Sequence, residues 1–313
     1  MQTLVSQGTI EQMSSVKSCF APNSIPILFV DYIGNGFFSI IVRLCIVLFG
    51  LFSFQCMAAE IDIIDTNVPE SEKVKVRQWL NYGVNAVSKT LGPLPQKRIE
   101  IEVIQQRNAR EPVPFAEVNR SKPIKVKLTV DAFATLDDFI EDWTLYHELS
   151  HLYLPYLDYP SFWLTEGFAT YMQYVTMLKS QIINRQSFIE RMRDGFIRGA
   201  NQTEKHPGRL ADVADNMWQR RAYKRVYWSG AAFFVEVDYQ LMSQDLSLAD
   251  VITRYSRCCL REYNTGKHLM AEFDNLTQTT AFTDAYQKYA KRRDFPKISE
   301  LQIERVADYY SKH

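Results

Sequence analysis

The chain has 313 residues, of which 46% are hydrophobic and 13% aromatic, so it can bury the core of one large domain or two ordinary ones. Lysine plus arginine and aspartate plus glutamate both number 36, which excludes a strong overall field that would favour nucleic acid or anionic lipid as a partner. We therefore expect the function to depend on a local site.

The leader, residues 1–59, differs from the rest of the chain and predicts an export signal. Arg43 precedes the apolar run 44–54, and residues 57–59 (Met-Ala-Ala) are typical of a cleavage site. The apolar run is shorter than the roughly 20 residues of a membrane span, which favours cleavage and export to the periplasm or the outside of the cell. If residues 37–58 are counted as one segment, an uncleaved membrane anchor is the alternative.

The place of this signal also bears on the start of the protein. A signal peptide begins near its charged residue, yet about 40 residues precede Arg43. We expect that the start codon is assigned too early and that residues 1 to about 35 are absent from the protein made in the cell.

The chain from residue 60 onward begins with the pattern of a small sheet. Residues 70–92 have helical spacing and end on a glycine, and residues 98–105 alternate between apolar and polar side chains as a strand does. Two further runs, 114–120 and 124–131, also resemble strands. We expect the sheet to be complete before the chain turns to helices.

Beyond these strands the pattern is helical. Residues 134–154 carry apolar side chains at three- and four-residue steps, and Pro155 ends that helix. A second helix is expected from about residue 164, and a later one carries residues 226–242. Strands first and helices afterwards predict an α+β fold, a small mixed sheet followed by a helical half whose C-terminal part starts at about residue 180.

The cysteines predict no disulfide framework. Three of the five lie in the leader, which leaves the adjacent pair Cys258 and Cys259. A helix that begins at Ser247, with Asp250 three residues later, is expected to carry this pair. Because neighbouring side chains on a helix diverge, we expect two free or buried thiols.

The second half of helix 134–154 contains a metal-binding pattern. On a helix His147 and His151 project from one face about one turn apart, so both imidazoles can reach the same ion. Two neutral ring nitrogens at this spacing suit zinc. Glu148 lies beside the pair and is placed to act as a general base on water rather than as a ligand.

A catalytic zinc takes three protein ligands and leaves one position for water, so a third ligand is needed. The metzincin pattern is excluded because Leu154 and Leu157 occupy the positions of its glycine and histidine. The candidate is Glu166, with 14 residues between it and His151, a loop long enough to bring the chain back. Gly167 beside it would let the two helices approach closely.

These motifs resemble those of the gluzincin metallopeptidases of the peptidase MA-like superfamily. Residues 147–151 read His-Glu-Leu-Ser-His and residues 163–167 read Trp-Leu-Thr-Glu-Gly, which is similar to the catalytic domains of the aminopeptidase N and glycyl aminopeptidase families. The resemblance is specific over residues 143–172 and architectural over 98–297. It implies one Zn²⁺ ion held by His147, His151 and Glu166, with Glu148 activating water.

The resemblance also implies a tyrosine that steadies the oxyanion. In those families it lies in a Tyr-x-Lys-Gly-like segment of a later helix, and "VYWSGAAFF" is the matching stretch here. Tyr227 is the candidate, and Ser229 stands where lysine is usual. Tyr223, one turn earlier, is the alternative.

Together these features predict that residues 60–313 form the catalytic domain of an exported zinc-dependent peptidase acting on a peptide or protein substrate. We expect no nucleic acid partner, and we expect membrane association only if the leader is an uncleaved anchor. The alternative is a non-catalytic module that keeps the metal and binds a peptide or protein. The aminopeptidase N family binds the free amine of its substrate with a segment that this chain lacks. Glu117 could take the place of that segment, although a glutamate on a strand usually faces solvent. Exopeptidase and endopeptidase action are therefore both open.

Overall fold

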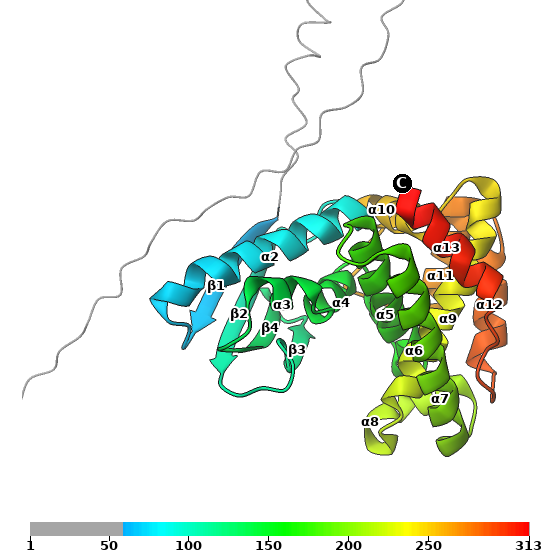
Figure 1. The fold of residues 1–313 in the computed structure, drawn as a ribbon. Coiled ribbons are helices and arrows are strands. Elements are labelled where there is room, and N and C mark those ends of the chain that lie inside the picture. Colours follow the sequence, from blue (N-terminus) through cyan, green and yellow to red (C-terminus); the bar gives the residue numbers. More distant parts are fainter. Residues whose placement is uncertain (1–58, 313) are drawn as a thin grey trace, which may run out of the picture. The chain divides into compact units, whose positions relative to one another are not determined.

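A computed structural model of the protein describes residues 59–312 (Figure 1). The candidate export signal or anchor at residues 37–58 lies outside the described residues. Within 59–312, none of the helices combines the length and the apolar character that a bilayer crossing requires.

The sheet has four strands in the order β1-β2-β4-β3. Neighbouring strands are parallel except for β3, which runs antiparallel to β4 and forms one edge of the sheet. The small mixed sheet is thus confirmed, and β1 is a strand that the sequence analysis did not include. The strands span Glu60–Thr66 (β1), Arg98–Gln106 (β2), Phe115–Asn119 (β3) and Ile124–Asp131 (β4).

The alternating residues of the central strands give the sheet one apolar and one charged face. Ile101 of β2 and its partner Val126 of β4 are fully buried. On the other face Lys125 lies 3.7 Å from both Glu100 and Glu102. The period-2 pattern therefore directs one face of the sheet into the core.

Helix α2 (Glu70–Leu91) follows β1 and ends where Gly92 takes a φ of +85°. Figure 1 shows it running along the same side of the sheet as α3 (Leu136–Glu141). The buried Trp79 of α2 stacks on Phe139 of α3 with ring centroids 4.8 Å apart.

The single helix expected over residues 134–154 is wrong. It is two helices, α3 and α4 (Thr144–His151), because Asp142 leaves the helical conformation and its carboxylate accepts a hydrogen bond from the Thr144 amide. Thr135 and Asp138 form a capping box at the start of α3. The metal-binding pattern therefore lies on a short helix with its own start.

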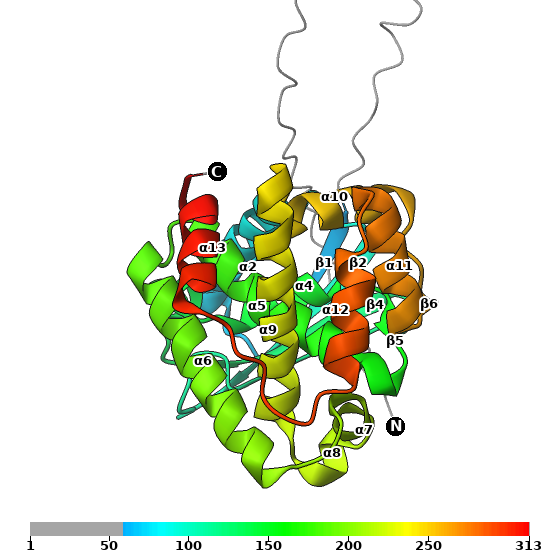
Figure 2. The same cartoon turned by 90° about the vertical axis from the view of Figure 1, so that its right-hand side faces the viewer.

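The helical half is built around α5 and α9, which pack side by side, with α12 and α13 on either side of α9 (Figure 2). The expected α+β class is confirmed. The helices of this half span Phe162–Lys179 (α5), Arg185–Lys205 (α6), Leu210–Asp215 (α7), Met217–Arg220 (α8), Tyr223–Leu241 (α9), Leu248–Cys258 (α10), Gly266–Thr277 (α11), Ala281–Ala290 (α12) and Glu300–Lys312 (α13).

Four of these helices meet at the buried carboxylate of Asp238 in α9. Its Oδ2 accepts hydrogen bonds from the hydroxyls of Tyr171 in α5 (2.6 Å) and Tyr310 in α13 (2.8 Å), and its Oδ1 accepts one from the Leu248 amide at the start of α10 (2.7 Å). A buried carboxylate with these three donors is well satisfied. It ties the amino end of α10 to the central pair.

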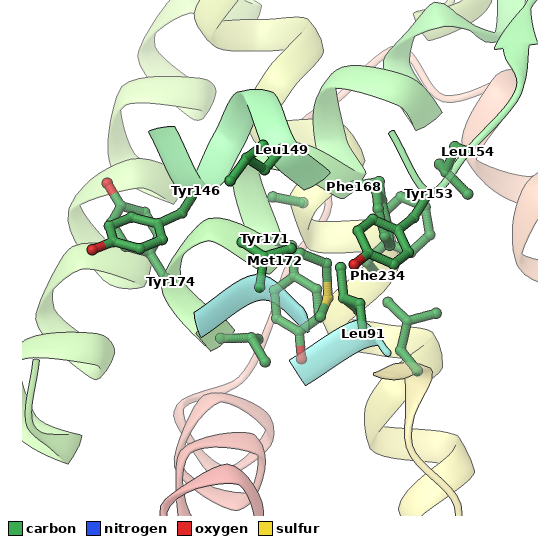
Figure 3. Packing of buried hydrophobic residues seen from close by; sticks show 14 of the residues in the cluster. Leu91, Tyr146, Leu149, Tyr153, Leu154, Phe168, Tyr171, Met172, Tyr174 and Phe234 are labelled. Carbon is green, nitrogen blue, oxygen red and sulfur yellow. The ribbon is translucent and has the colours of Figure 1, made fainter. Parts of the chain in front are cut away.

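The core between the sheet side and the helical half is apolar and continuous. Figure 3 shows side chains from α2, α4, α5 and α9 packed on one another, each buried. They include Leu91, Leu149, Tyr171, Met172 and Phe234.

The expectation of two free thiols at Cys258 and Cys259 is also wrong, because the two residues form a disulfide. The capping box of Ser247 and Asp250 starts α10 as expected, but the helix ends at Cys258. Cys259 has φ −138° and ψ −2°, outside the helical region, so its side chain need not diverge from that of its neighbour. Four residues later Tyr263 pairs with Tyr156 in a short two-stranded sheet.

Candidate metal centre

The two histidines of α4 point to one place, as their spacing predicts. Both are buried, with 4% of His147 and 7% of His151 exposed, and their rings meet edge to face with centroids 4.8 Å apart. Burial lowers the pKa of His151 to about 3, so its imidazole is neutral at neutral pH. A neutral imidazole is the form that binds a metal.

Glu166 of α5 completes a group of three. Its Oε2 lies 3.4 Å from Nε2 of His147 and 3.8 Å from Nε2 of His151, and the ligand atoms of the three residues all lie within 4.8 Å of one another. Oε2 is buried and finds no hydrogen-bond donor among residues 59–312. Two imidazoles and a carboxylate with one unsatisfied buried oxygen are the donor set of a three-ligand zinc site.

Gln173 fixes the orientation of the first histidine. Its Oε1 lies 2.8 Å from Nδ1 of His147, so this ring nitrogen carries the proton and donates it, and Nε2 stays free toward Glu166. Gln173 is buried and lies seven residues after Glu166, two turns along α5. Gln173 was not predicted from the sequence, although its seven-residue spacing from Glu166 places both residues on the same face of α5.

Arg120 ties the edge of the sheet to the end of α4. Its guanidinium donates hydrogen bonds to the carbonyl oxygens of His151 (2.5 Å) and Leu154 (2.8 Å). These carbonyls lie at the carboxyl end of the helix, where a cation is favoured. Strand β3 and its following residues are thereby held next to the metal-binding helix.

Glu148 lies beside the ligands and faces the same cavity. Burial raises the pKa of its carboxyl to about 7; the electrostatic interaction with the imidazole of His147 opposes this rise, and the carboxylates of Glu166 and Glu117 add to it. A carboxyl with a pKa near neutrality can both accept and return a proton. This is the property that a general base in this position requires.

Tyr227 of α9 also reaches the site, and Tyr223 does not. The ring of Tyr227 stacks on that of His147 at 6.1 Å, and burial together with the carboxylate of Glu166 raises its pKa well above the usual value. Its hydroxyl therefore keeps its proton and can donate it. Tyr223 packs instead on Trp218 with ring centroids 5.4 Å apart.

The close approach expected at Gly167 exists, but its partner is α9 rather than the metal-binding helix. A Cβ on Gly167 would lie 2.3 Å from the Cα of Gly230. The residues next to this contact are Glu166 on α5 and, one turn before Gly230, Tyr227 on α9. The glycine pair therefore sets the distance between a candidate ligand and the candidate oxyanion donor.

One cavity of about 440 Å³ is lined by the three candidate ligands and by Glu148 and Tyr227. Glu117 on β3 also lines it, with 54% of its side chain exposed and Lys127 3.9 Å away. Apart from Tyr227, the aromatic side chains of this cavity were not predicted from the sequence. The lining residues are Ala116, Glu117, Val118, Asn119, Arg120, His147, Glu148, His151, Tyr156, Phe162, Thr165, Glu166, Trp218 and Tyr227.

Comparison with known proteins connects this site to peptidases. The family model described as M61 glycyl aminopeptidase matches residues 155–233, the stretch that contains Glu166 and Tyr227. No curated protein matches the chain.

The structure resembles solved metallopeptidases. An aminopeptidase N family protein from Idiomarina loihiensis superposes with a TM-score of 0.57 at 13% identity, over 80% of this chain and 48% of that protein. An M1 zinc metallopeptidase from Deinococcus radiodurans has a TM-score of 0.47 at 17% identity, over 74% of this chain and 46% of that one. The chain spans about half the length of the structures that it matches.

In fold the chain resembles the aminopeptidase N family protein, and it carries a His-His-Glu group that could hold a metal ion, as expected from the gluzincin-like motifs of the sequence. In sequence the chain is similar to the M61 glycyl aminopeptidases over residues 155–233.

Proposed function

We propose that this chain is an exported zinc-dependent peptidase that binds one zinc ion through His147, His151 and Glu166. The observation that carries the proposal is the gathering of these three ligand atoms within 4.8 Å of one another. Glu148 and Tyr227, the candidate base and oxyanion donor, line the same cavity. A His-x-x-x-His pair that arose by chance would not be accompanied by a third ligand, a base and an oxyanion donor.

The reaction is hydrolysis of a peptide bond by water. Bound zinc would supply Lewis acidity, which polarises the scissile carbonyl and makes water more acidic. Glu148 accepts a proton from the attacking water and passes it to the leaving amine, a role that suits its pKa of about 7. Tyr227 donates a hydrogen bond to the carbonyl oxygen as negative charge develops there.

Residues around the ligands hold this arrangement in place. Gln173 keeps the proton of His147 on Nδ1, and Arg120 fixes the end of α4 against strand β3. Within residues 59–312, the edge position of β3 leaves one side of this strand without a neighbouring strand in the sheet. A peptide or protein substrate in the cavity would therefore lie along β3.

Zinc analysis of the purified protein, beside digestion of a mixed peptide library read by mass spectrometry, tests the proposal. We expect about one zinc per chain and cleavage that a chelator abolishes and added zinc restores. The cleavage products also show whether the enzyme acts at chain ends or internally. Full zinc with no cleavage of any peptide would instead favour a non-catalytic, metal-retaining binding module.

Export is the second part of the proposal and rests on the leader sequence. The charge at Arg43, the apolar run and the small residues at 57–59 predict a mature protein that begins near Ala59 or Glu60. Amino-terminal sequencing of exported protein tests this. Protein that retains residues 44–54 and sediments with membranes would mean an anchor.

A further inference from the structure

The cavity of the metal centre has a second, aromatic end. Phe162, the first residue of α5, lies at its middle, with the ring of Trp218 at 6.4 Å, that of Tyr156 at 6.5 Å and that of Tyr159 at 6.4 Å. We call these four residues the aromatic cluster. Three of its members, Phe162, Tyr156 and Trp218, line the same cavity as the candidate metal ligands.

These rings are exposed to an extent that packing alone does not explain. Trp218 is 54% exposed, Tyr159 52% and Tyr156 37%. A single exposed aromatic residue is ordinary, but neighbouring exposed rings on the wall of a cavity mark a binding site. Large aromatic side chains dominate the energy of such sites because each buries a large area on contact.

The side chain of Trp218 in the aromatic cluster is also preorganised. Helix α8, which carries Trp218, ends where Arg221 takes a left-handed conformation with φ +53°, and the Arg221 amide donates to the Trp218 carbonyl. The indole contacts two further rings, with its centroid 5.4 Å from that of Tyr223 and 6.4 Å from that of Phe162. Its orientation is thus set before any ligand arrives, which lowers the entropic cost of binding.

The distance between the two ends of the cavity decides which residue of a peptide reaches the cluster. Phe162 precedes Glu166 by four residues, so their Cβ atoms lie about 5–6 Å apart on one face of α5. An extended peptide advances about 3.3 Å per residue. The side chain beside the scissile bond therefore falls within reach of the aromatic cluster.

We propose that the aromatic cluster is a specificity subsite that binds an aromatic or large aliphatic side chain next to the scissile bond. The proposal rests on the proposed peptidase function and adds its substrate class. Aromatic rings accept such side chains by burial and ring stacking, whereas they offer little to a small or charged residue. The enzyme thus cleaves beside Phe, Tyr, Trp, Leu or Met in preference to Gly, Ser or Asp.

The test compares matched peptides that differ only in the residue on either side of the cleaved bond. We expect kcat/KM for Phe or Leu to exceed that for Ala or Ser by about 10- to 100-fold, the value of burying one large side chain. Trp218→Ala should remove most of this preference, so that kcat/KM for the Phe peptide falls toward that for the Ala peptide. Trp218→Phe should retain most of it. Phe133→Ala, an exposed aromatic residue that does not line the cavity, is the matched control and should keep the preference.

A binding measurement separates this inference from the proposed reaction. Zinc-loaded Glu148→Gln protein should bind the Phe peptide about 10-fold or more tightly than the Ala peptide, and Glu148→Gln/Trp218→Ala protein should bind both alike. Cleavage without preference, or a preference that survives Trp218→Ala, would overturn the subsite while the peptidase function stands. Absence of cleavage with preferential, Trp218-dependent binding would overturn the reaction and leave the subsite.

Discussion

Gly167 and Gly230 meet backbone to backbone where α5 and α9 cross: a Cβ on Gly230 would lie 1.9 Å from the carbonyl oxygen of Trp163 and 2.7 Å from the Cα of Gly167. No side chain separates the two helices at this point. Glu166 and Tyr227 flank the contact, so the same glycines that allow the helices to pack also set the width of the candidate site.

Gly230→Ala should therefore be destabilising, although alanine favours a helix over glycine by about 1 kcal/mol. The new methyl group meets backbone atoms that cannot rotate away, and forcing the helices apart should lower the free energy of unfolding by at least about 2 kcal/mol. Urea unfolding followed by circular dichroism measures this.

Gly83→Ala is the control for that experiment. Its added Cβ would lie 2.3 Å from the tip of the Leu145 side chain, a flexible group that can change rotamer. We expect a smaller loss than for Gly230→Ala. Equal losses in the two variants would mean that the backbone contact between α5 and α9 has no special importance.

The parts of the fold that the sequence predicted are those fixed by local pattern. The spacing of His147 and His151 needs only one turn of helix to bring the rings together. The predicted pair is therefore correct although the predicted helix was too long. Ser247 and Asp250 form the predicted capping box because its hydrogen bonds are local. The alternation of residues 98–105 and 124–131 likewise placed two strands correctly.

The parts that the sequence did not predict depend on contacts between distant segments or on backbone angles at one residue. Nothing near Gly167 indicates that its partner is Gly230, 63 positions away. The break between α3 and α4 depends on one side-chain bond from Asp142, within an apolar pattern that continues across it. The bond between Cys258 and Cys259 depends on where α10 ends.

The contact between Gln173 and His147 predicts a role in metal affinity. Gln173→Ala removes the acceptor that holds the proton on Nδ1, so the ring can turn or take the other tautomer, and zinc affinity should fall about 10- to 100-fold. Competition with a chelator of known affinity measures this. Gln173→Glu keeps an acceptor at the same distance and should retain most of the affinity. If both variants bind zinc like the wild type, Gln173 does not position the ligand.

Asp238 predicts a dependence of stability on pH. Burial raises its pKa to about 6, although Tyr171, Leu248 and Tyr310 donate hydrogen bonds that act the other way. Between the ordinary carboxyl value and this one, the folded chain holds a proton that the unfolded chain has lost. The stabilising effect of protonated Asp238 is therefore complete below about pH 4 and is lost as the pH rises through about 6. The free energy of unfolding changes by up to about 3 kcal/mol over this range.

Asp238→Asn should abolish this part of the pH dependence. The free energy of unfolding of the wild type minus that of the variant should decrease between pH 4 and pH 7, measured by urea unfolding at each pH. Asp212→Asn is the exposed control, because Arg209 lowers the pKa of Asp212 and any change should have the opposite sign. A difference that rises with pH for Asp238→Asn would contradict the argument.

Tyr227→Phe should lower turnover by about 10- to 1000-fold, because one donor to the developing oxyanion is lost. The ring that stacks on His147 is kept, so zinc content and stability should be close to those of the wild type. Tyr223→Phe is the matched control on the same helix. Tyr223 does not line the cavity, and its variant should be nearly fully active. A silent Tyr227→Phe with an impaired Tyr223→Phe would reverse the assignment of the two tyrosines.

Glu148 and Glu166 are both buried glutamates of one cavity, but substitutions of the two should change different properties of the enzyme. Glu148→Gln keeps the size of the side chain and all three candidate ligands. This variant should bind zinc near stoichiometrically and lose about 100-fold or more in rate, the usual value of a positioned general base. Glu166→Ala removes the carboxylate whose Oε2 lies 3.4 Å from His147. Its zinc affinity should fall directly, and added metal should restore part of the activity.

The contrast between the two variants is the test, because a general loss of stability would damage both alike. Zinc affinity under chelator competition and kcat at saturating zinc, measured for both, separate the ligand from the base. Wild-type zinc affinity in Glu166→Ala would mean that the third ligand is another residue. In that case the unsatisfied Oε2 of Glu166 would need a different partner, and the His-His-Glu site would not be the metal centre.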